Sequence, residues 1–420
     1  MKLLSTRTRR NFLGSLVLVL VASATVRSGA ADLGSAPQKL PLLHIKDFQF
    51  AGAFRLPSDK YGASDLNYSQ GPIAFNPDRK SLFIVGHSHQ QAIAEFKIPK
   101  LVSSKVLSEL NMASDPIQSF ARVLHRASGG NPDNNNRIGG MLYIPGRERP
   151  QLLVNTYEYY DAPGDSTTST LVLRDANDLA KCDVNGYFKV QGGPGHTAGW
   201  LSPIPTPWQS ALGGGFLMGN SSGIPIISRA SVGPTAFVFN PSDIVGDRLP
   251  AKPVSTIRLL DFSLGNRLHD DLYNKLLKNK LWNHLSQAVF GVIVPGTRTY
   301  ATFGSSGGNE TGIGYKIVQD NGALSGGYSS RAVKDNYHYY WLWDVNDLTR
   351  VRAGKMKAHE VRPYEYGILH TPFASLSQSL GGGTFDPNTG RIYLTAQGAD
   401  REQGKYANPP VVMAYKVVLP

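Results

Sequence analysis

Short apolar segments separated by polar turns recur along the chain from about residue 48 to its end. One recurring segment is an apolar strand that runs into a polar turn closed by Leu or Ile. Its copies lie at 95–101, 173–179, 237–244 and 342–348. A second apolar segment recurs upstream of these copies and near the C-terminus. It lies at 71–77, 139–145, 289–295 and 382–387, with a degenerate version at 202–220. Such self-similarity is typical of repeat architectures and predicts five like units.

Each unit holds two strands joined by a hairpin, then a variable loop and a third strand. A fourth strand is expected after the third in four units, at 120–124, 187–190, 254–259 and 359–362. Four-stranded antiparallel sheets repeated around an axis form a β-propeller. The predicted fold is therefore an all-β propeller in one domain, residues 42–420, with five blades. Six or seven blades are the alternative if some of these units contain two.

The two ends of the predicted domain complement each other. The fifth unit lacks a fourth strand because the chain ends there, whereas Phe48–Arg55 precedes the first unit without a partner. This segment is expected to complete the last blade, which would close the ring and cover two open sheet edges. Five leucines recur at roughly helical spacing between residues 268 and 285, which predicts one helical insertion on the rim.

The first thirty residues differ from the rest of the chain. Arg9-Arg10-Asn11-Phe12-Leu13 precedes an apolar run at 16–21 and small residues at 28–31. This pattern resembles a twin-arginine signal peptide over residues 1–30, with a Sec-type signal as the alternative. The apolar run is too short to span a bilayer. The mature protein is therefore expected to be periplasmic or secreted from a bacterium, and no other segment resembles a transmembrane helix.

Charge and cysteine content narrow the classes of partner. The formal net charge is +12, and residues 1–30 supply five basic and no acidic residues, so +7 remains for the rest of the chain. The remaining basic residues form no long runs, so nucleic acid is not an expected partner. A modest positive field suits an anionic substrate or adhesion to an acidic cell envelope. The single cysteine, Cys182, cannot form an intramolecular disulfide.

In a propeller, the connections between blades and the loops between second and third strands share one face, around the mouth of the central channel. The position of a polar residue within its repeat unit therefore predicts whether it lies on this face. The candidate site residues on this face are His87, His89, Asn135, Arg137, Tyr157, Tyr159, His196, Asn220, Tyr337, His338 and Arg401. Among these, His87, Tyr157 and His196 are the catalytic candidates, and the others are expected to bind substrate. The face is also expected to carry Gln287, Gln378 and Gln397.

The loop from Tyr157 to Asp165 is unusually aromatic. In an extended strand Tyr157 and Tyr159 would point to the same side. Tyrosines near histidines and asparagines suit sugar binding, because their flat faces pack on sugar rings and their hydroxyls form hydrogen bonds. The alternative is that these tyrosines pack neighbouring blades together.

The architecture resembles that of exported β-propeller carbohydrate-active proteins: glycoside hydrolases such as arabinanases and fructan hydrolases, and secreted polysaccharide lyases. The hydrolases place a proton donor and a base, both carboxylates, across the scissile bond. The carboxylates that this chain offers near the expected face are Asp65, Glu158, Asp161 and Glu310, and they form no obvious triad.

The lyase resemblance implies a different use of the same face. A lyase neutralises a uronate carboxylate, removes the C5 proton with a base and protonates the leaving oxygen. His87, His196 and Tyr157 supply the base and acid types, and Asn135 and Arg137 suit the carboxylate. The expected function is thus a lyase on a uronate-containing polysaccharide. The alternatives are a non-catalytic propeller that binds a glycan or envelope component, and a glycoside hydrolase.

Metal and cofactor signals in the sequence are weak. His87 and His89 could share a metal with His196 or His338, and a calcium site on Asp or Asn loops is an alternative. The sequence contains no P-loop, no G-x-S-x-G elbow and no Rossmann fingerprint. The glycine runs at 213–215 and 381–383 are expected on strands, where they would allow close packing of blades. Any cofactor and the oligomeric state therefore stay unknown.

Overall fold

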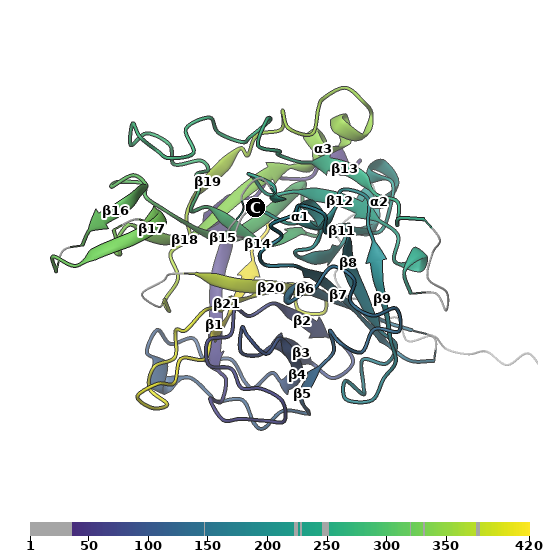
Figure 1. Ribbon diagram of the computed structural model, residues 1–420. Coiled ribbons are helices and arrows are strands. Elements are labelled where there is room, and N and C mark those ends of the chain that lie inside the picture. The colour runs from purple at the N-terminus through teal and green to yellow at the C-terminus, as the bar shows by residue number, and fades with distance from the viewer. Residues whose placement is uncertain are drawn as a thin grey trace, which may run out of the picture. The chain divides into compact units, whose positions relative to one another are not determined.

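The recurring apolar segments form strands that pair into five four-stranded antiparallel sheets, with one further two-stranded hairpin. The structure is a computed structural model that describes residues 36–146, 148–221, 226, 229–245, 252–319, 321–330, 332–374 and 379–420. Figure 1 shows the five sheets arranged around a common centre. The fold is therefore a five-bladed β-propeller, as the repeat predicts. The expected signal peptide at 1–30 lies outside the described residues.

The strands of each blade are given from the axis outward. Blade 1 contains β2 (Ile73–Asn76), β3 (Ser81–Val85), β4 (Ala92–Lys97) and β5 (Gln118–Arg122). Blade 2 contains β6 (Arg137–Ile144), β7 (Gln151–Tyr157), β8 (Thr168–Leu173) and β9 (Val184–Lys189). Blade 3 contains β10 (Leu201–Pro203), β11 (Phe216–Met218), β12 (Ala236–Phe239) and β13 (Ile257–Leu260). Blade 4 contains β14 (Gln287–Ile293), β15 (Thr299–Gly307), β18 (Asn336–Asp344) and β19 (Glu365–Ile368). Blade 5 contains β20 (Leu380–Asp386), β21 (Arg391–Ala396), β22 (Val411–Val417) and β1 (Phe48–Arg55). The hairpin of β16 (Gly314–Val318) and β17 (Leu324–Ser330) extends from the loop between β15 and β18.

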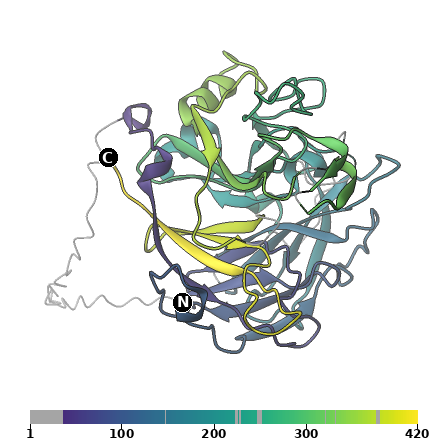
Figure 2. The ribbon, with the colours of Figure 1, turned by 90° about the vertical axis from the view of Figure 1, so that its left-hand side faces the viewer.

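The last blade is closed by the N-terminal strand, as expected. β1 pairs with β22 from Phe48 opposite Val417 to Arg55 opposite Val411, and Figure 2 shows the purple β1 beside the yellow β22. Arg55 also donates to Asp400 through Nε at 2.7 Å and through Nη2 at 3.0 Å. The two ends of the domain are thus held together by a strand pair and a buried ion pair.

The first strands of the five blades line the axis, where each contacts the first strands of its two neighbours. This close approach depends on glycine. A Cβ on Gly381 would lie 2.5 Å from the backbone oxygen of Gln70, and a Cβ on Gly139 would lie 2.1 Å from that of Ala198. The glycines at 381–383 therefore allow blades to pack closely, as predicted. The run at 213–215 does not lie on a strand: Gly213 follows helix α2 (Thr206–Leu212) in the left-handed conformation.

The core lies between the blades and is richest in aromatic side chains around blade 4. Its largest fully buried side chains include Trp208, Trp282, Trp341, Trp343 and Tyr300. Together with aliphatic residues of all the strands, they bury enough apolar surface to hold the fold without a disulfide. No helix in the described part of the chain is long and apolar enough to cross a membrane.

The predicted helix between residues 268 and 285 is wrong: the segment forms a series of turns. Its asparagines hydrogen-bond the local backbone instead. Asn279 Oδ1 accepts from the amides of Leu281 and Trp282, and Asn283 Oδ1 accepts from Leu285. Such bonds compete with helical ones, so they outweigh the leucine spacing.

The helices lie elsewhere in the described residues. They are α1 (Pro194–Thr197), α2 (Thr206–Leu212) and α3 (Val345–Arg352). The fourth strand of blade 4 also differs from the prediction, because it forms at Glu365–Ile368 and not at 359–362. The strand predictions at 120–124, 187–190 and 254–259 overlap β5, β9 and β13.

Candidate functional site

A cavity of about 250 Å3 lies on the propeller axis and takes lining residues from all five blades. Blades 1 and 2 contribute Gln70, Pro72, Ile138, Gly139, Tyr157 and Tyr159, and blade 3 contributes Gly199, Trp200 and Asn220. Blades 4 and 5 contribute Gln287, Ala288, Val289, Ser379, Gly381 and Gln397. We call this the central cavity. It lies where the repeat places the site, at the mouth formed by the starts of first strands and the ends of second strands.

The floor of the central cavity is closed by packed side chains and backbone. The Trp200 indole is buried, and its Nε1 donates to the Tyr300 hydroxyl at 3.1 Å, which in turn donates to the Thr235 carbonyl at 2.9 Å. Below it, the first strands leave a void of only about 10 Å3. A void of this size is at the lower limit for a single water molecule. The central cavity is therefore a closed-ended pocket that a ligand would enter from the mouth.

Two tyrosines line the blade 2 side of the cavity, and Arg137 contacts one of them from outside the lining. Tyr157 and Tyr159 both line it, so they share one face as predicted from the sequence. The Arg137 guanidinium lies 4.7 Å from the centre of the Tyr159 ring, a cation–π distance. Burial raises the pKa of Tyr157 to about 12, although the charge of Arg137 acts in the opposite direction. Tyr157 is thus neutral near pH 7 and suited to hydrogen bonding, not to acting as a base.

Carboxamide groups supply much of the polar lining. Asn220 Nδ2 donates to the Pro194 carbonyl at 3.0 Å, and Gln397 Nε2 donates to the Leu380 carbonyl at 3.1 Å. These bonds orient both groups and leave their side-chain oxygens as acceptors. Gln70 and Gln287 also line the cavity, and no described residue hydrogen-bonds their side-chain amides. No Asp, Glu, His, Lys or Arg occurs among the described lining residues, so the lining is uncharged.

His87 and His89 lie on the rim above blade 1, outside the described lining of the central cavity. Their ring centres are 5.5 Å apart, and the Tyr68 ring lies 5.7 Å from that of His87. His87 Nδ1 accepts a hydrogen bond from the His89 amide at 3.1 Å. Gln70, which precedes the first strand of blade 1, lines the cavity on this side.

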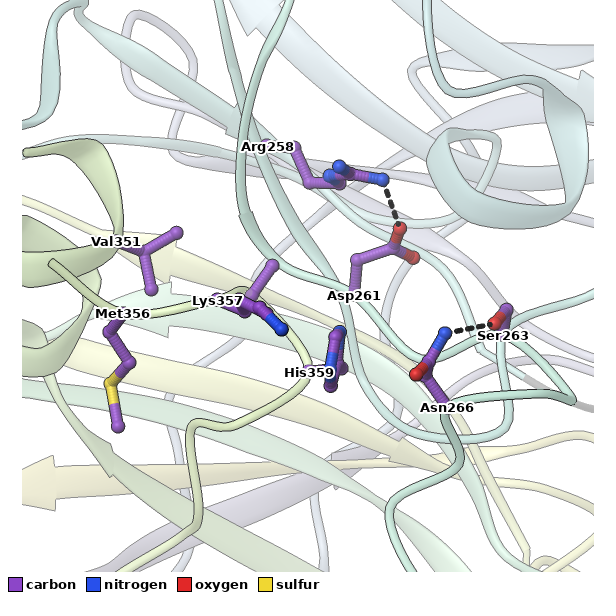
Figure 3. A pocket seen from close by; sticks show the side chains of 9 residues that line it. Arg258, Asp261, Ser263, Asn266, Val351, Met356, Lys357 and His359 are labelled. Carbon is purple, nitrogen blue, oxygen red and sulfur yellow. Dashed lines mark hydrogen bonds and ion pairs between the residues drawn. The ribbon is translucent and has the colours of Figure 1, made fainter. Parts of the chain in front are cut away.

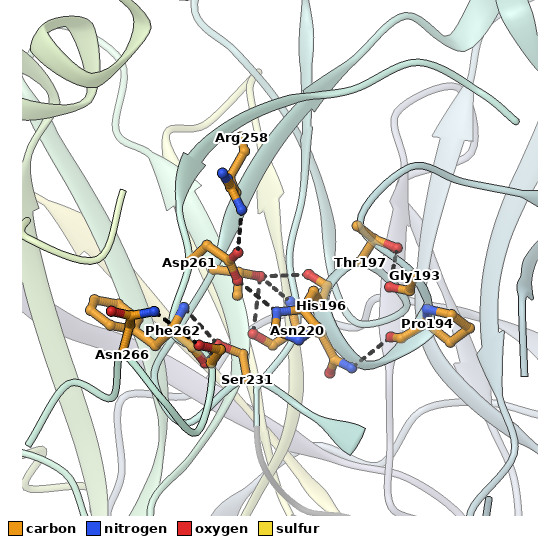
Figure 4. Close-up of polar contacts among 12 residues, drawn as sticks. Gly193, Pro194, His196, Thr197, Asn220, Ser231, Arg258, Asp261, Phe262 and Asn266 are labelled. Carbon is orange, nitrogen blue, oxygen red and sulfur yellow. Dashed lines mark hydrogen bonds and ion pairs between the residues drawn. The ribbon is translucent and has the colours of Figure 1, made fainter. Parts of the chain in front are cut away.

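His196 pairs with an acidic residue that the sequence did not single out. Its Nδ1 lies 2.6 Å from Asp261 Oδ1, and Arg258 Nη1 lies 3.5 Å from Asp261 Oδ2. Figure 4 shows Asp261 between His196 and Arg258. His196 lies on α1 and is linked to the cavity through Thr235, whose hydroxyl contacts both the His196 carbonyl and the Asn220 amide. It does not line the central cavity itself.

A second, lateral pocket of about 430 Å3 lies between β13 and the segment that follows α3. Figure 3 shows Arg258, Asp261, Lys357 and His359 along its wall. β13 is the outer strand of blade 3, so this pocket is on the perimeter of the propeller. Charged side chains therefore gather here and not at the axis.

The remaining predicted residues lie outside the described lining of the central cavity. Asn135 is buried, and its Nδ2 donates to the Thr168 hydroxyl at 3.1 Å. Tyr337 lies on β18, where burial and the neighbouring Asp335 raise the pKa of its hydroxyl to about 12. His338 is only 2% exposed, which leaves its ring no surface for a substrate. Arg401 is exposed in the blade 5 loop, and Gln378 lies outside the described residues.

A metal site finds no support in the described residues. No group of three or more His, Cys, Asp or Glu side chains there could hold an ion. The rings of His87 and His89 are close, but His196 pairs with Asp261 and His338 is buried beside Thr371.

Sequence reasoning placed Tyr157, Tyr159, Asn220, Gln287 and Gln397 on the face around the channel mouth, and all of them line the central cavity. It missed Gln70, Trp200 and Ser379. Each of these lies within three residues of the start of a first strand, at β2, β10 and β20. Position relative to a first strand is thus the signal that could have found them.

Comparisons with known proteins identify no family. No family model and no curated protein matches the chain in sequence. Among solved structures, an exo-1,5-alpha-L-arabinanase from a bovine ruminal metagenomic library has a TM-score of 0.40 at 10% identity, covering 84% of this chain and 95% of that one. The catalytic domain of a Coprinopsis cinerea GH62 alpha-L-arabinofuranosidase has a TM-score of 0.34 at 9% identity, covering 87% and 97%. RAG in complex with one melted and one unmelted RSS has a TM-score of 0.32 at 8% identity, covering 87% and 83%. TM-scores below 0.5 do not carry an activity from these proteins to this chain.

Proposed function

We propose that the protein is a carbohydrate-binding propeller that takes an uncharged saccharide in the central cavity. The observation that supports this most is the lining: two tyrosines and four carboxamides, with no charged side chain among its described residues. Tyrosine faces pack on sugar rings, and carboxamides both donate to and accept from sugar hydroxyls. A neutral ligand also leaves no charge to be neutralised in a cavity that is closed at one end.

The lyase prediction receives no support from this lining. β-Elimination requires a base at the reacting carbon and a group that neutralises the uronate. No carboxylate, histidine, lysine or arginine lines the described cavity, and Tyr157 holds its proton near neutral pH. An anionic substrate likewise has no counter-charge there except Arg137, which contacts the cavity through Tyr159.

Hydrolysis of a glycoside is the second candidate function, and one position favours it over the lyase. Glu158 lies between the two cavity-lining tyrosines, and its Oε2 accepts from the Ser166 hydroxyl at 3.1 Å. Hydrolysis needs two carboxylates, and Asp161 in the same loop is the other candidate.

The test is a binding titration by calorimetry with neutral and uronate-containing oligosaccharides. Arabinan fragments belong in the panel because two structural neighbours act on arabinose glycosides by name. We expect binding of a neutral member. Tyr159→Ala should weaken it by about 1.5 kcal/mol, roughly tenfold, because truncation removes a ring face from the cavity lining. Tyr366→Ala is the matched control, since this partly exposed tyrosine lies on β19, the outer strand of blade 4.

Three outcomes would contradict the proposal. One is no binding to any neutral saccharide, and another is unchanged binding by Tyr159→Ala. The third is an unsaturated product from a uronate polymer, which would establish the lyase instead. New reducing ends that disappear in Glu158→Gln would establish hydrolysis at the same site.

We also propose that the protein is exported, on the strength of Arg9-Arg10 and the apolar run that follows. Residues 1–36 fused to a reporter should direct it to the periplasm, and replacing both arginines by lysine should stop this. A reporter that stays in the cytoplasm with the native leader would contradict the assignment.

A further inference from the structure

An exposed tyrosine next to the central cavity has an unusual backbone conformation. Tyr68 is 56% exposed and has φ of 53°, in the left-handed region. Non-glycine residues adopt this region rarely, and it is least costly for Asn and Asp. An aromatic residue that is both strained and exposed contributes little to folding. Such a conformation persists only where the surrounding structure fixes it.

Hydrogen bonds from two other segments fix the Tyr68 backbone. Its amide donates to Asn408 Oδ1 at 2.8 Å, and the Asn408 amide donates back to Asn67 Oδ1 at 3.0 Å. Its carbonyl accepts from the Ser88 amide at 3.2 Å. Blade 5 and the loop after β3 therefore hold this tyrosine in place from both sides.

The ring of Tyr68 belongs to a row of three rings. It meets the His87 ring edge to face at 5.7 Å, and His87 is followed by His89 at 5.5 Å. The bond from the His89 amide to His87 Nδ1 fixes the middle ring. We call Tyr68, His87 and His89 the rim platform. The Tyr68 backbone and the His87 ring are thus held in position before any ligand binds, which reduces the entropy lost on binding.

The rim platform adjoins the central cavity. Gln70, two residues after Tyr68, lines the cavity, and its carbonyl accepts from Gln397 Nε2 at 3.4 Å. Gln397 itself lines the cavity, so the surface continues from the cavity to the platform along blades 1 and 5. The cavity of about 250 Å3 is smaller than pockets that enclose a typical small ligand, roughly 300–1,000 Å3. A ligand of several sugar residues would therefore extend out of it.

We propose that the rim platform is a second sugar-binding subsite, and that the natural ligand is a neutral oligosaccharide or polysaccharide chain of several residues. One end of the bound segment would occupy the central cavity, and the next residues would pass over Tyr68 and the two histidines. This inference rests on the proposed function. It assigns His87 and His89 to ligand contact at the rim.

The dependence of affinity on saccharide length tests whether the rim platform binds sugar. The probes are a length series, from mono- to hexasaccharide, of the neutral sugar that the wild-type protein binds. Wild-type affinity should rise with length. Tyr68→Asn removes the ring, and Asn tolerates the left-handed backbone. It should weaken hexasaccharide binding by roughly five- to tenfold and leave monosaccharide binding unchanged.

Further variants separate the platform from the cavity. Tyr68→Phe keeps the ring and should retain most of the affinity for long chains. Tyr159→Ala should weaken every length, and Tyr366→Ala should weaken none. The platform is contradicted if wild-type affinity does not depend on length, or if Tyr68→Asn binds the hexasaccharide like wild type. Monosaccharide binding in those cases would leave the proposed function standing. If the wild-type protein binds no saccharide at all, both proposals fail.

Discussion

His338 should make the folded protein sensitive to mild acid. The ring is buried in β18, and its Nδ1 lies 2.8 Å from Thr371 Oγ1. The Thr371 hydroxyl donates to the Phe373 carbonyl at 3.1 Å, which leaves its oxygen able to accept from His338 Nδ1. Burial lowers the pKa of His338 to about 4, although the Ser379 backbone acts in the opposite direction. The neutral ring is therefore the form that the fold accommodates.

The sign and size of the effect follow from linkage. Because the folded-state pKa is below the unfolded value of 6.5, the unfolded state binds the proton more readily. The neutral ring then favours the folded state above about pH 6.5, and this contribution is lost as the pH falls towards 4. From the two pKa values, the loss between about pH 7.5 and about pH 5 is roughly 2 kcal/mol. The full loss below pH 4 is about 3 kcal/mol.

Urea unfolding followed by tryptophan fluorescence measures this loss at the two pH values. His338→Gln should lose roughly 2 kcal/mol less than the wild-type protein between them, because all other titrating groups are common to both. His89→Gln, which removes an exposed histidine, should keep the wild-type pH dependence. Equal pH dependence in wild type and His338→Gln would refute the reasoning. An NMR titration of the folded wild-type protein gives an independent answer: a His338 pKa near 6.5 would refute it even if the variant does not fold.

Two further changes test how the ring is closed and packed. Asp400→Ala should destabilise the protein by about 3–5 kcal/mol in urea unfolding, because it leaves the partly buried Arg55 guanidinium without its buried partner. Asp270→Ala, at a fully exposed carboxylate, should leave the free energy of unfolding unchanged. If Asp400→Ala has an equally small effect, the ion pair does not hold the closure. Gly381→Ala should cost about 1–3 kcal/mol, since its Cβ would lie 2.5 Å from the Gln70 oxygen. Gly265→Ala meets no such contact, so equal unfolding midpoints for the two glycine variants would contradict the close-packing argument.

The fold could be predicted because strand pairing in a propeller is mostly local. The pairs β2–β3, β6–β7 and β20–β21 are hairpins, so each blade carries its own pattern in a short stretch of sequence. The closure by Phe48–Arg55 could be predicted because two sheet edges would otherwise stay unpaired. The helix at 268–285 failed for the opposite reason. Leucine spacing describes one face of a segment, but the turns there are set by buried asparagines that bond the local backbone.

The candidate site was predictable by face but not by distance from the axis. The repeat places His87 and Gln397 at equivalent ends of second strands, yet Gln397 lines the cavity and His87 lies on the rim. The difference arises because the segment before β2 pairs with His87: the His87 amide donates to the Asp65 carbonyl and to the Ser64 hydroxyl. This loop is held in turn by Asn408, more than 300 residues away in sequence. Hydrogen bonds between residues so far apart leave no local pattern in the sequence. Tertiary contacts alone therefore decide how far each side chain lies from the axis, and so whether it lines the cavity or lies on the rim.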